Sequence, residues 1–105
     1  MTAKRNILYK IKSAVENSDP NATVILYGSY ARGDHNKNSD IDLLILVDHD
    51  KLTRNKAKNI KYPLYDIEFE TGTIISPIIL TRKDWENKHR ITPFYENVTK
   101  EGQVL

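Results

Sequence analysis

The sequence contains no cysteine, only one tryptophan and no long apolar segment. The absence of cysteine excludes a disulfide scaffold and thiolate metal sites, and it weakly favours a cytoplasmic location. The longest uninterrupted aliphatic run, Leu43 to Val47, is far too short to span a bilayer, and the N-terminus is charged and lacks the apolar stretch of a signal peptide. We therefore expect a protein of the cytoplasm without a membrane segment.

A strong excess of charge of either sign is also missing. The chain has 16 Lys and Arg residues and 14 Asp and Glu residues, which gives a formal net charge of +2, and the basic residues are dispersed. Direct nucleic-acid binding is therefore not expected as the main activity, because it depends on a concentrated basic surface. The length of 105 residues predicts a single domain over residues 1–105.

The apolar pattern predicts an α/β (α+β) fold, in which a small mixed β-sheet of about three strands is flanked by helices. Pro77 lies inside the third predicted strand and removes a ladder donor, so it favours an edge position or a bulge. Pro63 indicates either a break between two helical segments or, as we expect, one kinked helix. The predicted helices cover residues 4–16, 30–33, 53–71, a short segment after Thr81 and residues 92–101, and the predicted strands cover residues 22–27, 41–47 and 73–80.

The most informative stretch is residues 27–34, with the sequence YGSYARGD, which follows the first predicted strand. Gly28 has no Cβ, so it can adopt a positive φ and allow backbone amides to approach an anion closely. The Ser29 hydroxyl and the amides after it can donate hydrogen bonds to phosphate oxygens, and a short helix from Tyr30 would direct its positive end at the same place. Taken alone, the turn could equally be a simple connection between strand and helix.

Two aspartates, Asp40 and Asp42, open the next apolar run. Because side chains alternate between the two faces of a strand, both carboxylates point to the same side. A divalent cation relieves their repulsion, and oxygen ligands suit Mg²⁺ (or Mn²⁺), which typically binds one or two carboxylates together with substrate phosphates. The turn and the aspartates together predict a site for phosphoryl or nucleotidyl transfer with bound metal ions.

These segments, Gly28-Ser29, Arg32-Gly33 and Ser39-Asp40-x-Asp42, resemble the G-S-x-x-R-G…S-D-x-D signature of the minimal nucleotidyltransferases (MNT type) of the DNA polymerase β superfamily. The resemblance implies the nucleotidyltransferase fold. It also implies an enzyme that transfers a nucleoside monophosphate from an NTP, with ATP expected, to an acceptor hydroxyl. It assigns nucleotide binding to Gly28, Ser29, Arg32 and Ser39, and both catalysis and metal binding to Asp40 and Asp42.

The same resemblance implies the partners. In this family the acceptor can be a protein, and stand-alone domains often act as the antitoxin of a toxin–antitoxin pair with a helical HEPN-type toxin. We therefore expect an NTP and a HEPN-type helical protein as partners, and association with further copies of the chain stays open. Aminoglycoside nucleotidyltransferases share the motif, but they carry an additional helical domain or a dimer surface that closes over the drug, and this chain has no room for an added domain.

One acidic residue of the family pattern is missing. Active members usually carry a third carboxylate on the strand beside the paired aspartates, and the corresponding position here is Ser76. At neutral pH a serine is neither a base nor a good Mg²⁺ ligand. Glu70 could supply the third carboxylate if the end of its helix lies over the sheet, although we expect a true loss. The alternative function is therefore a catalytically weakened or inactive nucleotide-binding interaction module.

Arg32 also allows two interpretations. Its guanidinium could contact the triphosphate, or it could form an ion pair that fixes the loop, with Asp34 as the nearest partner in the sequence. The sequence does not decide between them.

Overall fold

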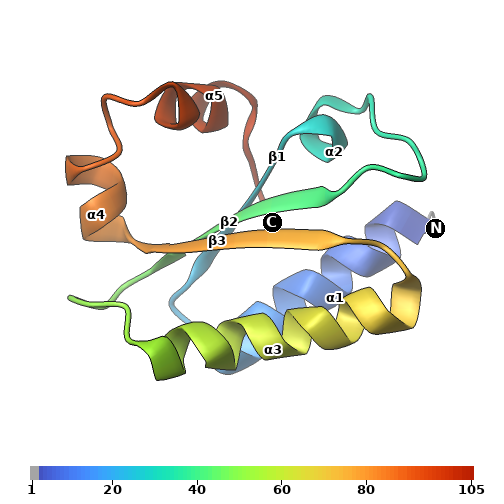
Figure 1. Cartoon of the computed structure of the whole chain (residues 1–105), viewed down its shortest axis with the longest axis horizontal. Coiled ribbons are helices and arrows are strands. Elements are labelled where there is room, and N and C mark those ends of the chain that lie inside the picture. The colour runs from blue at the N-terminus through green and yellow to red at the C-terminus, as the bar shows by residue number, and fades with distance from the viewer. Residues whose placement is uncertain (1–2) are drawn as a thin grey trace.

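The computed structural model describes residues 3–105, with side chains from Asn6 onward. Figure 1 shows one sheet with α1 and α3 side by side along one face and with α4 and α5 on the other side, and α2 follows the end of β1. None of the helices within the described residues is both long and apolar enough to cross a membrane. The elements are α1 (Ala3–Ser18), β1 (Thr23–Tyr27), α2 (Ser29–Arg32), β2 (Ile41–Val47), α3 (Arg54–Thr71), β3 (Ile75–Thr81), α4 (Arg82–Asn87), α5 (Pro93–Glu101) and β4 (Gln103–Val104).

The sheet has four strands in the order β3-β2-β1-β4. Strand β2 pairs antiparallel with β1 and parallel with β3, and β4 pairs antiparallel with β1. The expected mixed α/β sheet is confirmed, and β3 lies at an edge, as Pro77 predicted. The fourth strand was not expected, because two residues after a helix carry no strand pattern of their own.

Helix boundaries follow the local signals. The Thr53 side chain accepts a hydrogen bond from the Lys56 amide at 3.2 Å, and this caps α3. Helix α3 then continues through Pro63 as one helix and ends at Gly72, whose φ is +73°. Thr81 and Thr92 likewise cap α4 and α5.

The two faces of the sheet carry different cores, which we call the α1/α3 face and the α4/α5 face. Alternate residues of β2 point to opposite faces. Leu43 and Ile45 pack in the larger cluster beneath α1 and α3, whereas Leu44 and Leu46 pack with Trp85 in a smaller cluster beneath α4 and α5. The face of a residue on β2 therefore decides which of two environments it meets.

Candidate active site

A glycine turn joins β1 to α2. Gly28 has φ +76° and ψ −156°, and its carbonyl accepts hydrogen bonds from the amides of Ala31 (3.1 Å) and Arg32 (3.0 Å). A Cβ at Gly28 would collide with Oδ2 of Asp42, so the turn lies directly against that carboxylate. The positive φ expected at Gly28 is confirmed, and the close approach to Asp42 is a second reason why no larger residue fits.

Asp42 lies in a row across three strands on the α4/α5 face. Its register partners are Tyr27 of β1 and Ser76 of β3. The Tyr27 ring packs edge-on against Phe94 at a centroid distance of 5.3 Å. Burial, and then the negative charge of Asp42, raise the pKa of Tyr27 to about 12, so this phenol stays protonated at neutral pH. Asp42 therefore has a protonated hydroxyl group on each neighbouring strand.

Three charged groups act on the carboxylate of Asp42. The side chain is half-buried, and this burial is the largest cause that raises its pKa above the ordinary value. The negative charges of Asp40 and Glu101 raise the pKa further, and the positive charge of Arg32 lowers it. The aspartate pair expected from the sequence is therefore electrostatically coupled, and its repulsion outweighs the help from Arg32.

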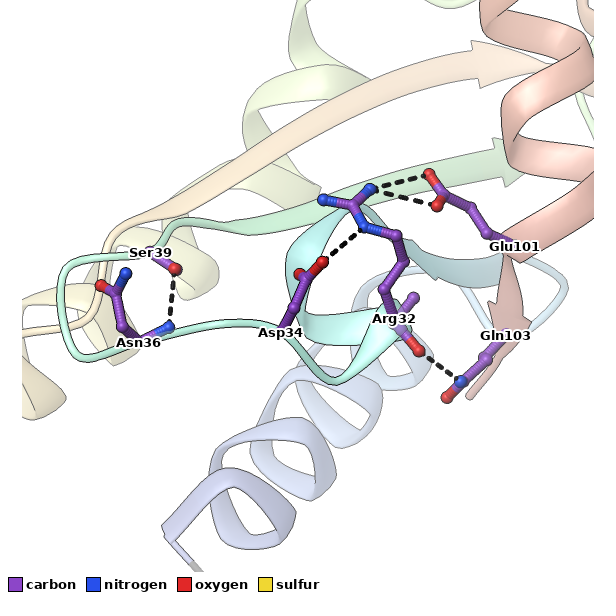
Figure 2. A network of polar contacts seen from close by, with 7 residues as sticks. Arg32, Asp34, Asn36, Ser39, Glu101 and Gln103 are labelled. Carbon is purple, nitrogen blue, oxygen red and sulfur yellow. Dashed lines mark hydrogen bonds and ion pairs between the residues drawn. The ribbon is translucent and has the colours of Figure 1, made fainter.

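Arg32 is held between two carboxylates (Figure 2). Its Nε donates to Oδ2 of Asp34 at 3.1 Å, and its Nη1 donates to both oxygens of Glu101, at 3.1 and 3.4 Å. Gln103 of β4 adds a second link between α2 and the C-terminal segment, since its Nε2 donates to the carbonyl of Ala31 at 2.9 Å. Of the two interpretations of Arg32, the structure contains the ion pair with Asp34, and it adds Glu101, which sequence reasoning missed.

The two serines of the motif have different surroundings. Ser29 begins α2, and its carbonyl accepts hydrogen bonds from the amides of Gly33 (2.9 Å) and Asp34 (3.1 Å). The Ser39 hydroxyl accepts a hydrogen bond from the amide of Asn36 at 2.9 Å, which closes the loop before β2 (Figure 2). Ser39 thus stabilises the loop that directly precedes the two aspartates.

The structure does not bring Glu70 to the aspartates. Glu70 lies near the end of α3, the helix that covers the opposite face of the sheet, and its carboxylate lies 3.8 Å from Nζ of Lys10. The suggestion that Glu70 supplies the third carboxylate is therefore wrong, because α3 packs on the face of the sheet opposite to the one that carries Asp42. The position beside Asp42 on β3 is Ser76. Among the side chains described, no three His, Cys, Asp or Glu residues are grouped so that they could hold a metal ion.

Comparison with known proteins places the chain among nucleotide-transferring domains. Residues 8–103 match the family model described as a nucleotidyltransferase domain. Two relatives come from Methanocaldococcus jannaschii, and both are named as a putative protein adenylyltransferase. The first is 47% identical over 57 residues, which cover 53% of this chain and 56% of the relative. The second is 39% identical over 84 residues, which cover 78% of this chain and 75% of the relative. The chain thus spans just over half of the first relative and three quarters of the second.

Solved structures share the fold at low sequence identity. A chain of a toxin–antitoxin structure with AMP-PNP has a TM-score of 0.58 and 18% identity, over 98% of this chain and 72% of that one. A chain of the tri-AMPylated Shewanella oneidensis HEPN toxin in complex with MNT antitoxin has a TM-score of 0.58 and 16% identity, over 96% and 70%. A nucleotidyltransferase structure from Sulfolobus solfataricus, described as putative, has a TM-score of 0.58 and 23% identity, over 94% and 76%.

Proposed function

The chain belongs to the nucleotidyltransferase domain family, and we propose that it transfers a nucleoside monophosphate from an NTP, with ATP as the first candidate, to an acceptor hydroxyl. The observation that carries this proposal is the contact between the Gly28 turn and the carboxylate of Asp42. It puts a turn suited to phosphate beside a half-buried acid that a second acid repels. The nucleotidyltransferase family expected from the sequence signature is confirmed by the family match and the relatives.

Within this proposal, the glycine turn, Arg32 and the two aspartates have separate roles. The Gly28 turn and Ser29 would hold the β- and γ-phosphates, and Arg32 would exchange part of its ion pairing for the triphosphate. Asp40 and Asp42 would hold Mg²⁺ (or Mn²⁺), which two carboxylates together with phosphate oxygens suit, and a bound ion would supply charge neutralisation. The fit is supported by the repulsion of Asp42 by Asp40, which such a cation would relieve.

The transfer itself exchanges one bond for another. The acceptor oxygen forms a bond to the α-phosphorus, the bond from the α-phosphorus to the bridging oxygen breaks, and pyrophosphate leaves. Ser76 cannot take the acceptor proton as a carboxylate on β3 would, so the proton passes to solvent. General-base catalysis typically contributes about 10²–10⁴-fold, so we expect slow transfer.

We further propose that the acceptor hydroxyl belongs to a protein, with a helical HEPN-type toxin as the partner and this chain as its antitoxin. Two observations support this extension. Both relatives are named for protein adenylyltransfer, and two solved structures of the same fold are toxin–antitoxin structures.

A second candidate function is a nucleotide-binding module that acts by binding its partner without turnover. Ser76 at the register position of Asp42 favours it, because the site then lacks a base. The ion pairs of Arg32 with Asp34 and Glu101 favour it too, since they occupy the group that would neutralise the triphosphate.

Calorimetric titration of ATP with Mg²⁺ tests the proposal without knowledge of the acceptor. Wild type should bind, and Asp40→Asn/Asp42→Asn should lose Mg²⁺-dependent binding. The control Asp50→Asn/Asp66→Asn removes two exposed carboxylates elsewhere and should bind like wild type. Absence of binding in wild type would show that the site is vestigial. If ATP binds, release of pyrophosphate in the presence of a candidate acceptor protein separates the enzyme from the binding module.

A further inference from the structure

The outward side of α3 carries a stripe of exposed aromatic side chains. Tyr62, Tyr65 and Phe69 are 56%, 44% and 91% exposed, and the rings of Tyr62 and Tyr65 lie 6.2 Å apart. The opposite side of the same helix is buried against the sheet through Leu64 and Ile67. The spacing of three and four residues puts the aromatic side chains on one face of the helix. A stripe of this kind on one helix is typical of a contact surface.

The charges of α3 are divided between its two halves. The first half has four basic residues and no acidic one, and the second half has three acidic residues and no basic one. This order is the reverse of the one that the helix dipole favours, which is acidic at the N-terminus and basic at the C-terminus. Among the ion pairs that the structure describes for these residues, only Glu70 has a partner, Lys10, and the carboxylate of Glu68 accepts a hydrogen bond from the Ile75 amide at 2.8 Å. The residues concerned are Arg54, Lys56, Lys58, Lys61, Asp66, Glu68 and Glu70.

We propose that a second copy of this chain packs antiparallel along α3. The two-fold axis would pass near Tyr65, so that each Tyr65 faces its counterpart and Tyr62 faces the partner's Phe69. The basic half of each helix then lies opposite the acidic half of the other, and the two helix dipoles also oppose each other. One arrangement thus covers the aromatic stripe and compensates a charge order that is unfavourable within the single helix.

This inference does not depend on the proposed transferase function. Helix α3 covers the α1/α3 face, whereas Asp42 lies on the α4/α5 face with Leu44 and Leu46. The dimer therefore leaves both candidate active sites open, and its failure would say nothing about nucleotide binding.

The oligomeric state of the full chain tests the proposal. At the roughly 50 µM chain concentration of a sedimentation-velocity experiment, a dimer with a Kd of about 1 µM is almost fully formed. Phe69→Glu should give a monomer. Ile91→Glu introduces the same glutamate at an apolar residue that is 94% exposed outside α3, and this variant should stay dimeric. Circular dichroism and Tm establish that both variants are folded. A monomeric wild type, or a Phe69→Glu variant that stays dimeric, overturns the proposal and leaves the stripe to a different protein.

The orientation can be tested because the chain has no cysteine. Near the two-fold axis, Tyr65→Cys places two thiols close enough for a disulfide, which needs Cα atoms within about 7 Å. Asn55→Cys, near the start of the same exposed helix, should not cross-link, whereas in a parallel pair both variants would. The Kd of the dimer should also rise with salt concentration, because the Debye screening length falls from about 30 Å at 0.01 M to about 3 Å at 1 M and the charge pairing weakens. A Kd that does not rise with salt would contradict the proposed pairing of the basic and acidic halves of α3.

Discussion

The two faces of the sheet differ in what covers them. On the α1/α3 face, two long helices bury a large apolar cluster that includes Ile11, Leu43 and Leu64. On the α4/α5 face, two short helices cover a small cluster around Leu44 and Trp85, and the face ends in charged groups. The strand β2 supplies both faces by simple alternation.

Because of this difference, one strand supplies residues to the stabilising core on one face and to the candidate site on the other. Leu43 and Leu44 follow Asp42 directly, and both are fully buried, yet they belong to different clusters. The incomplete cover of the α4/α5 face leaves Asp42 half-buried and open to a ligand. We expect changes on the α1/α3 face to alter the free energy of unfolding, and changes on the other face to alter binding.

The largest expected effect is on the α1/α3 face. Leu64→Ala, at a fully buried position of α3, should lower the free energy of unfolding by about 2–5 kcal/mol, because it leaves a cavity in the main core. The Kd for ATP with Mg²⁺ should not change while the protein is folded. Urea denaturation and calorimetry measure the two quantities, and the control Leu64→Met should lose less than about 1.5 kcal/mol. Altered nucleotide affinity in folded Leu64→Ala would show that the faces are coupled.

The next effect belongs to the glycine turn. Gly28→Ala should weaken binding of ATP with Mg²⁺ at least about tenfold, or 1.4 kcal/mol, because the Cβ collides with Asp42 and φ is +76°. Gly72→Ala is a matched control, since its φ of +73° gives the same backbone strain with no atom within 4 Å of the added Cβ. Gly72→Ala should lose about 1–2 kcal/mol of stability from the backbone strain alone, and Gly28→Ala should lose more, because its Cβ also collides with Asp42. Equal affinities for the two variants would contradict a role of the turn in the site.

A smaller effect is expected from Glu101. Glu101→Gln removes one of the two carboxylates that hold Arg32, so the guanidinium becomes available to the triphosphate. We expect ATP to bind only about 3–5-fold more tightly, because ion pairs of solvent-exposed groups are weak. Glu96→Gln, on the same helix and paired with Lys100, is the control and should leave the affinity unchanged. Weaker binding in Glu101→Gln would instead mean that Glu101 positions Arg32 for the nucleotide.

Local signals predicted most of the fold. Strand β2 has the predicted bounds because its apolar run is bounded by polar segments. Helix α5 ends at the predicted residue and begins one residue later than predicted, at Pro93, because Thr92 is its N-cap. The signature of residues 27–47 identified the family for the same reason, since its elements are adjacent in the sequence. The roles assigned to its residues stay predictions.

Contacts between distant segments were beyond the sequence. Glu101 meets Arg32 across 69 residues, and β4 exists only because the chain after α5 returns to β1. The location of Glu70 depends on the face on which α3 docks, and periodicity gives the apolar side of a helix but not the face of the sheet that it covers. Those facts required the tertiary structure.

The smallest effect concerns the stability of the site itself. The pKa of Asp42 is raised by burial, by Asp40 and by Glu101, so the folded state holds the Asp42 proton more tightly than the unfolded state. This contribution to stability is present below the ordinary carboxyl pKa of about 3.9 and is lost as the pH rises through the raised value. At about pH 7 Asp42→Asn should therefore be more stable than wild type, by less than about 1 kcal/mol in the free energy of unfolding, and have a higher Tm. The difference should shrink toward about pH 3, where the wild-type carboxyl is protonated. Thermal unfolding at both pH values measures it, with Asp50→Asn as the control. A lower Tm for Asp42→Asn at neutral pH would show that the ionised Asp42 carboxylate stabilises the fold, which contradicts the destabilisation expected on the α4/α5 face.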